Sequence, residues 1–182
     1  MAGGHGAAHG VENKGVALLI AVLALFLAVA EMGGKSAQTE ALTKNVEAAN
    51  QWAFFQARTI RQTQLRAAAE QAALIPGDPQ AIAAQVARWN ATIARWESEP
   101  ETGEGRRELM ARARASEERR DRSLERYHMF EYASAAFQVA IVVASASIIT
   151  GVALLVWLGG GLGVVGFGLM VLGFVAPGLL HL

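Results

Sequence analysis

The sequence predicts an all-α membrane protein with three transmembrane helices and a helical hairpin or coiled-coil insert between the first two. The prediction depends mainly on where the charges fall. Nearly all Lys, Arg, Asp and Glu residues lie between Glu31 and Glu131, whereas residues 15–30 and 132–182 contain none. A helix of about 20 residues crosses the apolar core of a bilayer, and both blocks offer that length when the first is extended to residue 34, with only Glu31 charged inside it.

The overall composition excludes several classes of function. The 182 residues include 16 basic and 16 acidic side chains, so no bulk positive charge indicates nucleic-acid binding. The chain has no Cys, which excludes disulfides, thiolate metal sites and a Cys nucleophile. A hydrophobic fraction of 53% is high for a soluble protein of this size.

The first predicted span covers residues 15–34 and follows a Gly/His-rich tail, residues 1–14. Val16 to Ala30 is unbroken apolar sequence. Ala28-Val29-Ala30 also resembles a signal-peptidase site, but we expect the segment to be retained as a transmembrane helix. Small residues spaced four, three and four apart form a seam that suits close packing on another helix: Ala17, Ala21, Ala24 and Ala28.

The second and third predicted spans cover residues 133–158 and 164–180. We expect the glycine-rich segment 159–163 to form the turn between them. Trp157 suits the aromatic belt at a membrane interface. The last span is short and interrupted by glycines, so a re-entrant hairpin is an alternative to a full crossing.

The charged insert, residues 35–131, is predicted to contain three helices, about 36–75, 79–97 and 106–131. Asp78 and Pro79 are typical of a helix start. A heptad-like seam is expected along the first helix at Leu42, Val46, Ala49, Ala53, Gln56, Ile60, Thr63 and Ala67, and along the second at Ile82, Val86, Trp89, Ile93 and Trp96. The aromatic residues expected to pack this stalk are Trp52, Phe55, Trp89 and Trp96.

Basic residues predict the orientation. The insert carries an Arg-rich turn next to the second span, with Arg119, Arg120, Arg122 and Arg126, whereas the opposite membrane face offers only Lys14. The positive-inside rule therefore places residues 35–131 and the C-terminus in the cytoplasm and the N-terminus outside. The same arginines suit anionic lipid headgroups, although a solvated face is the simpler interpretation.

Polar side chains within the second span form a candidate site. Ser134, Gln138, Ser145 and Thr150 are candidates either to line a pore or to bond neighbouring helices. An unpaired amide is costly in hydrocarbon, so Gln138 is expected to face protein or water.

Two motifs carry a family resemblance. The segment Asn50-Gln51-Trp52-Ala53-Phe54-Phe55-Gln56-Ala57-Arg58 to Gln62, and His128-Met129-Phe130-Glu131 with the following span, resemble a bacterial domain-of-unknown-function family numbered 4337. The resemblance covers nearly the whole chain and implies a three-span protein of the bacterial inner membrane. It implies no activity.

No motif indicates catalysis. The sequence has no phosphate-binding loop, no Gly-x-Ser-x-Gly elbow and no His-Glu-x-x-His pair, so we expect no catalytic, cofactor-binding or metal-binding residues. The function that fits best is a homo-oligomeric scaffold that presents a cytoplasmic stalk, to which a protein partner could bind. The alternative is an oligomeric ion or small-solute channel lined by the second span.

Overall fold

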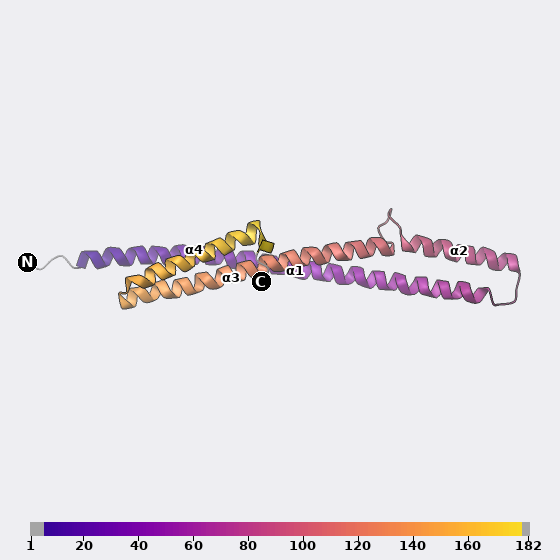
Figure 1. Ribbon diagram of the computed structural model, residues 1–182, viewed down its shortest axis with the longest axis horizontal. Helices are drawn as coiled ribbons and strands as arrows, with labels where there is room; N and C mark the ends of the chain where they lie inside the picture. Colours follow the sequence, from indigo (N-terminus) through magenta and orange to yellow (C-terminus); the bar gives the residue numbers. More distant parts are fainter. Residues whose placement is uncertain (1–5, 180–182) are drawn as a thin grey trace, which may run out of the picture. The chain divides into compact units, whose positions relative to one another are not determined.

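The computed structural model describes residues 6–179, with side chains from Lys14 onward. Four helices follow one another: α1 (Gly6–Ala72), α2 (Pro79–Glu97), α3 (Arg106–Thr150) and α4 (Ala153–Val175), and a short 3-10 helix, η1 (Pro177–Leu179), comes last (Figure 1). The described part of the chain is all-helical, which confirms the predicted class. Three helices, α1, α3 and α4, are long and apolar enough to cross a membrane.

Helix α1 joins segments that the sequence analysis treated separately. It contains 67 residues and runs without a break through the first predicted span into the first helix of the insert. The predicted tail differs from the structure, because residues 6–14 already belong to α1, while residues 1–5 lie outside the described residues. Adding a residue to an existing helix costs little, so an apolar helix readily extends into its flanks.

The predicted turn between the last two spans is wrong. The break falls at Gly151, which has a φ of +70°, and α4 begins at Ala153, so residues 159–163 are helical. Gly151 ends α3 in the left-handed conformation and donates its N–H to the carbonyl of Ser147 at 2.8 Å, as helix C-termini commonly do. Helix α4 has 23 residues, about 35 Å at 1.5 Å per residue, which is longer than the segment predicted.

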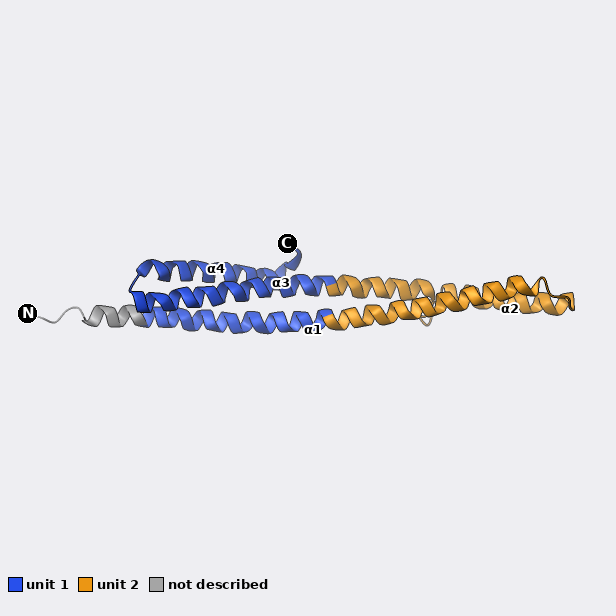
Figure 2. Ribbon diagram, turned by 90° about the horizontal axis from the view of Figure 1, so that it is seen from below, with its two compact units in different colours: residues 1–41, 121–182 blue, residues 42–120 orange. Residues whose placement is uncertain are grey.

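The chain divides into two compact units (Figure 2). Unit 1 comprises residues 1–41 and 121–182, and unit 2 comprises residues 42–120. In unit 1, parts of α1, α3 and α4 pack around a core of Leu23, Ala30, Phe130, Ala133, Phe137, Ala140 and Met170. Buried positions of α3 repeat every seven residues, at Leu109, Ser116, Ser123, Phe130, Phe137 and Ala144.

Glycines let the helices of unit 1 approach closely. The buried residues of α4 alternate steps of four and three: Gly159, Gly163, Gly166, Met170 and Gly173. A Cβ atom at position 166 would lie 3.1 Å from the ring of Phe137, and one at position 159 would lie 3.0 Å from the carbonyl oxygen of Ala140. Gly159 and Gly163, two of the glycines that were predicted to form a turn, therefore belong to a packing seam, as small residues commonly do between membrane helices.

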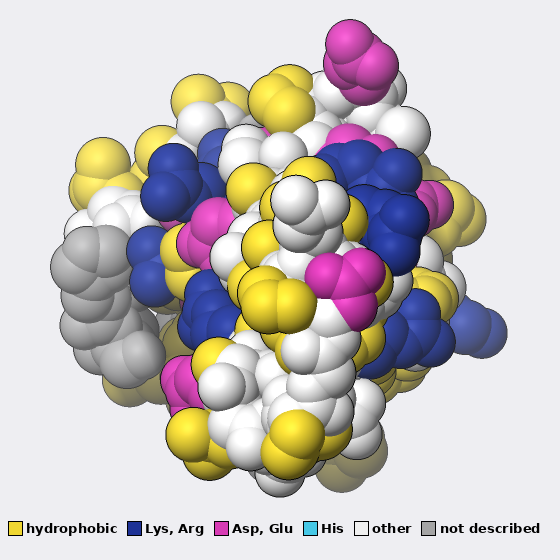
Figure 3. All heavy atoms as spheres, turned by 90° about the vertical axis from the view of Figure 1, so that its right-hand side faces the viewer, with side chains coloured by type: hydrophobic (Ala, Val, Ile, Leu, Met, Phe, Trp, Pro, Cys, Tyr) yellow, Lys and Arg dark blue, Asp and Glu magenta, His cyan; other side chains and the backbone are white. Residues whose placement is uncertain are grey.

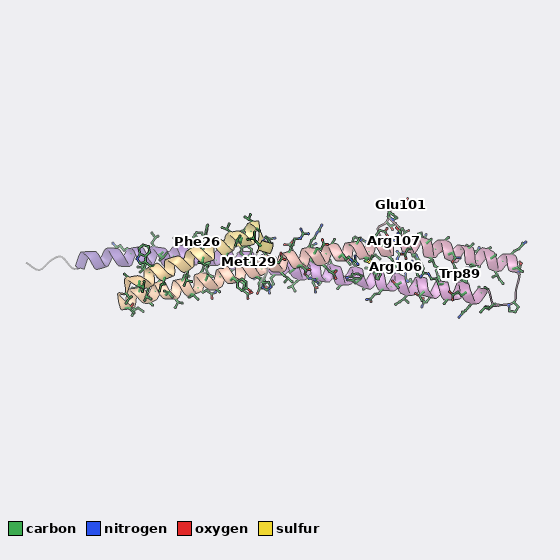
Figure 4. The ribbon with its side chains drawn as sticks, viewed as in Figure 1. Phe26, Trp89, Glu101, Arg106, Arg107 and Met129 are labelled. Atoms are coloured by element: carbon green, nitrogen blue, oxygen red, sulfur yellow. The ribbon has the colours of Figure 1, made fainter. Side chains whose placement is uncertain are left out.

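Unit 2 is a helical hairpin. Residues 42–72 of α1 form one arm, and α2 followed by the first part of α3 forms the other (Figure 1). The Asp78 carboxylate caps α2 by accepting from the backbone N–H of Gln80 at 3.0 Å, with Pro79 as the first helical residue. The loop 98–105 interrupts the second arm, and Glu101 at its tip points away from the helices (Figure 4).

The predicted seam of the first insert helix lies on the wrong face. Leu42, Val46 and Ile60 are 63%, 59% and 58% exposed, and the small and polar members of that seam are exposed as well. The face that packs within unit 2 carries Ala48, Phe55 and Gln62 instead, spaced seven residues apart. Small and polar residues fill most of that inner face, so hydrophobicity alone did not identify it.

We predict that bulk in the α4 seam destabilises unit 1. In Gly166→Leu the new side chain meets the Phe137 ring, and overpacking of this kind costs about 1–3 kcal/mol. Gly168→Leu is the matched control, because no atom lies within 4 Å of its Cβ position. The free energy of unfolding of both purified variants is measured in mixed detergent micelles. An equal loss of this free energy in the two variants would contradict the packing role.

Candidate functional site

A buried amide links three segments of unit 2. The side chain of Gln62 is 1% exposed. Its Nε2 donates to the carbonyl oxygen of Ile93 at 3.1 Å and to the Glu97 carboxylate at 3.4 Å. Its Oε1 accepts from the guanidinium of Arg106 at 3.1 Å. One side chain of α1 therefore binds the end of α2 and the start of α3, and thereby fixes the register of the two arms.

Arginine and aromatic side chains surround this amide. Arg106 also pairs with Glu97 at 2.9 Å, and its guanidinium carbon lies 5.0 Å from the centroid of the Phe55 ring. Arg106 Nε is buried and has no hydrogen-bond partner among the described residues. Trp52 packs edge-on against Phe55 and donates its indole N–H to Glu117 at 2.9 Å. Arg106 and the neighbouring Arg107, which pairs with Glu97 at 3.5 Å, are labelled in Figure 4.

The structure brings most of the predicted stalk aromatics to this cluster. The guanidinium of Arg58 lies 5.8 Å from the Trp96 ring, while Arg58 also pairs with Glu104 at 2.8 Å. Trp89 is half-buried on α2, two turns before Trp96 (Figure 4). The rings thus cover charged side chains in addition to filling an apolar core, and stacking of this kind stabilises a guanidinium at the edge of solvent.

The loop 98–105 is held by the carboxylate of Glu108. Ser98 donates its hydroxyl to that carboxylate at 2.6 Å, and the backbone N–H of Glu99 donates to it at 3.2 Å. These hydrogen bonds, led by the one from Ser98, lower the pKa of Glu108. Gly105 leaves room for them, because a side chain there would collide with Glu108, Glu99 and Ser98.

Glu97 is the carboxylate at the centre of the cluster. Burial raises its pKa, but the positive charge of Arg106 and hydrogen bonds from Gln62 and Arg107 outweigh that effect, so its pKa is lowered. The carboxylate is therefore held in the ionised form. Two carboxylates with lowered pKa values beside arginines form a structural ion-pair network, which suits stability better than proton transfer.

A groove of about 380 Å³ lies beside this cluster. It is lined by Glu47, Asn50, Gln51, Phe54, Arg58, Glu104, Leu109 and Arg112. Both of its cations are already engaged, since Arg58 pairs with Glu104 and Arg112 donates to the backbone carbonyl of Gly103. No group of three His, Asp or Glu residues within the described chain could hold a metal ion.

The structure separates the predicted polar face of α3. Ser134, Gln138 and Ser145 share one side, whereas Thr150 is rotated from Ser145 by about 140°. Ser145 and Thr150 donate their hydroxyls to carbonyls of their own helix, at Ile141 (2.7 Å) and Ala146 (2.9 Å). Gln138 is exposed and has no hydrogen-bond partner among the described residues. Of the four, only Gln138 combines exposure with an unsatisfied polar group.

Among the four predicted membrane-proximal arginines, Arg120 and Arg126 bind α1. Arg126 pairs with Glu40 at 3.5 Å within unit 1, and Arg120 donates to the side-chain oxygen of Asn45 at 3.4 Å within unit 2. Arg119 and Arg122 are exposed. Arg120 and Arg126 thus help to join α3 to α1.

Sequence reasoning missed Gln62, Glu97 and Arg106 as a cluster. The available signal was spacing, because Gln62 follows Ala48 and Phe55 at the same seven-residue interval. A search for apolar seams passes over a buried amide, and the cluster also depends on a loop that brings Arg106 back beside Glu97.

We predict that acid weakens this cluster. A lowered carboxyl pKa contributes stability above the unfolded-state pKa, and that stability is lost as the pH falls through the folded-state pKa. The protection of residues 93–108 against hydrogen–deuterium exchange in the full chain, corrected for the intrinsic exchange rate at each pH, is therefore expected to fall below about pH 4.3, the ordinary glutamate value. Glu97→Gln should lose part of this pH dependence, whereas the loop-tip control Glu101→Gln should keep it. Identical pH profiles in Glu97→Gln and the wild type would contradict the assignment.

Comparison with known proteins identifies a family. Residues 12–176 match a family model described as a domain of unknown function, DUF4337. No curated protein and no solved structure matches the chain. The matched segment includes all of α2, α3 and α4 and most of α1. The chain therefore belongs to the DUF4337 family, as its two motifs indicated.

Proposed function

We propose that this protein is a homo-oligomeric scaffold of the bacterial inner membrane, with unit 2 as a cytoplasmic stalk. The observation that carries the proposal is the exposed apolar face of α1 in unit 2. Its large members are Leu42, Val46 and Ile60, each more than half exposed. Burying one such side chain contributes about 1.5–3 kcal/mol, so a face that repeats them along a helix favours association.

The chemistry of this face favours another copy of the chain as the partner. Between Glu47 and Arg58 the sequence has no charged residue, and the polar neighbours of the face are amides and hydroxyls. Amides carry donors and acceptors together, so such a face is complementary to itself, and it carries no net charge that would attract an oppositely charged partner. Anchoring in one membrane also gives all copies the same orientation and a high local concentration.

The orientation is part of the same proposal. Basic residues flanking the apolar segments favour a cytoplasmic insert and C-terminus and an external N-terminus. The exposed side chains of Arg119 and Arg122 suit anionic lipid headgroups near the bilayer. We propose neither a cofactor nor an enzymatic activity. A cytoplasmic protein bound to the assembled stalk would be a further component of the scaffold.

We predict that polar residues on this face dissociate the oligomer. The triple variant Leu42→Asn, Val46→Asn, Ile60→Asn is expected to weaken self-association by at least about 100-fold, because three apolar contacts are lost. Native mass spectrometry of the full chain released from nanodiscs measures the copy number.

The control is Leu74→Asn with Ile75→Asn, since both residues are exposed at the α1–α2 turn. The end of the molecule that carries this turn is seen in Figure 3, with apolar and basic side chains at its surface. A wild-type monomer, or an unchanged copy number in the triple variant, would refute the proposal.

Gln138 supports a channel as the second candidate. Its exposed amide on α3 could line water in a ring of copies, with Ser134 and Ser145 on the same side. It could equally hydrogen-bond the amide of a neighbouring copy, as polar residues in membrane helices commonly do.

Gln138→Leu separates these two roles. In a channel, the substitution changes conductance in bilayer recordings while native mass spectrometry finds the same copy number. If Gln138 instead bonds a neighbouring helix, the substitution lowers the copy number, because each lost hydrogen bond removes roughly 0.6 kcal/mol of association free energy. An assembly of fewer than four copies would exclude the channel. A variant altered in neither measurement would exclude both roles for Gln138.

A further inference from the structure

Two opposite charges at the end of the first apolar segment have no partner in their own chain among the described residues. Glu31 follows the uncharged segment 15–30, and Lys35 follows one turn later on α1. Both side chains are exposed, and neither makes an ion pair or a side-chain hydrogen bond with any described residue. They do not bond each other, although a spacing of four residues allows it.

Their surroundings contrast with those of a charged pair that two helices of unit 1 form with each other. Glu40 of α1 is paired with Arg126 of α3 at 3.5 Å. Glu31 and Lys35 instead occupy a face of α1 that no helix of unit 1 covers. Positions 24, 28, 31, 35 and 38 alternate steps of four and three and are all exposed. A charge beside hydrocarbon is costly, so this face favours a partner that supplies opposite charges within about one helical turn.

We infer that two copies of the chain associate in parallel through this face of α1, with Glu31 of each copy paired to Lys35 of the other. The inference rests on the proposed homo-oligomer and specifies its geometry. Copies anchored in one membrane lie parallel, so the same residues of two copies stand at the same height. Four residues correspond to about 6 Å along the axis, within the combined reach of a Glu and a Lys side chain.

Symmetry makes this arrangement complementary. In an in-register pair, each copy supplies one acid and one base, so two reciprocal ion pairs form about a twofold axis. Glu31 of one copy stands level with Glu31 of the other, and Lys35 of the other copy, one turn away, supplies the opposite charge that offsets this repulsion. The exposed Ala24 and Ala28 add no bulk that would hold the two backbones apart.

Charge reversal in co-expressed, differently tagged full-length chains tests the inference. Glu31→Lys alone carries two bases and Lys35→Glu alone carries two acids, so each is expected to co-purify with itself about tenfold less than the wild type. Mixing these two single variants should restore wild-type recovery, because the two bases of one copy then face the two acids of the other. Glu101→Lys on the exposed loop is the control and should leave recovery unchanged.

The double variant Glu31→Lys, Lys35→Glu distinguishes contacts between copies from effects within one helix. It should associate with itself as the wild type does, which also shows that the reversed charges permit folding. It should fail to associate with the wild type, because both cross pairs between positions 31 and 35 then join like charges. Free mixing of the double variant with the wild type, unchanged single variants, or no recovery in the mixed singles would each overturn the inference.

If the charge variants leave recovery unchanged while the Leu42, Val46, Ile60 variant abolishes it, the oligomer stands and only this pairing fails. If wild-type copies do not co-purify, the oligomer itself fails.

Discussion

The contact of one phenylalanine ring with two glycines sets the spacing of the helices in unit 1. Phe130 is fully buried, and Cβ atoms at positions 33 and 173 would lie 2.9 Å and 3.3 Å from its ring. A side chain on either glycine would push α1 or α4 away from α3. The Phe130 ring also meets Phe174 edge-on at 4.8 Å, and one heptad later Phe137 stacks on Phe26 at 6.0 Å. Phe26 and Met129 on this part of the chain are labelled in Figure 4. Large rings packed against glycines bring the helices close together, and close packing of this kind is what holds apolar helices together where lipid gives no hydrophobic drive for association.

Signals carried by adjacent residues identified the helices, whereas the run of glycines at 159–163 wrongly predicted a turn. Asp78 and Pro79 define the start of α2 because capping is a property of a few adjacent residues, and the structure shows that cap. A run of glycines, however, suits a turn and a close helix contact equally well. Gly159 and Gly163 face Ala140, Ala144 and Leu23, which are distant in sequence, so their role depends on tertiary neighbours. The actual break at Gly151 is a single glycine within a long apolar stretch, and its positive φ is visible only in the structure.

The periodicity of α1 likewise left two faces that could pack inside unit 2. One apolar series contains Leu42, Val46 and Ile60, and a less hydrophobic one contains Ala48, Phe55 and Gln62. The second series packs inside unit 2, because its small side chains let the opposite arm approach closely. Gln62 in addition hydrogen-bonds both the end of α2 and the start of α3. Buried polar groups are retained where all their hydrogen bonds are made, and such networks specify register. Spacing could have placed Gln62 on this inner face, but the sequence could not assemble the whole polar cluster, because its members come from three segments and a loop whose path depends on Gly105 and Glu108.

The connection between α3 and α4 has a consequence for biogenesis. Gly151 and Val152 alone separate the two helices, and the segment from Tyr132 to Leu179 contains no charged residue. A link this short leaves no polar loop to be transferred across the bilayer. We expect the apolar parts of α3 and α4 to enter a membrane together as one hairpin, because this route moves no charge through hydrocarbon and exposes few unpaired backbone groups.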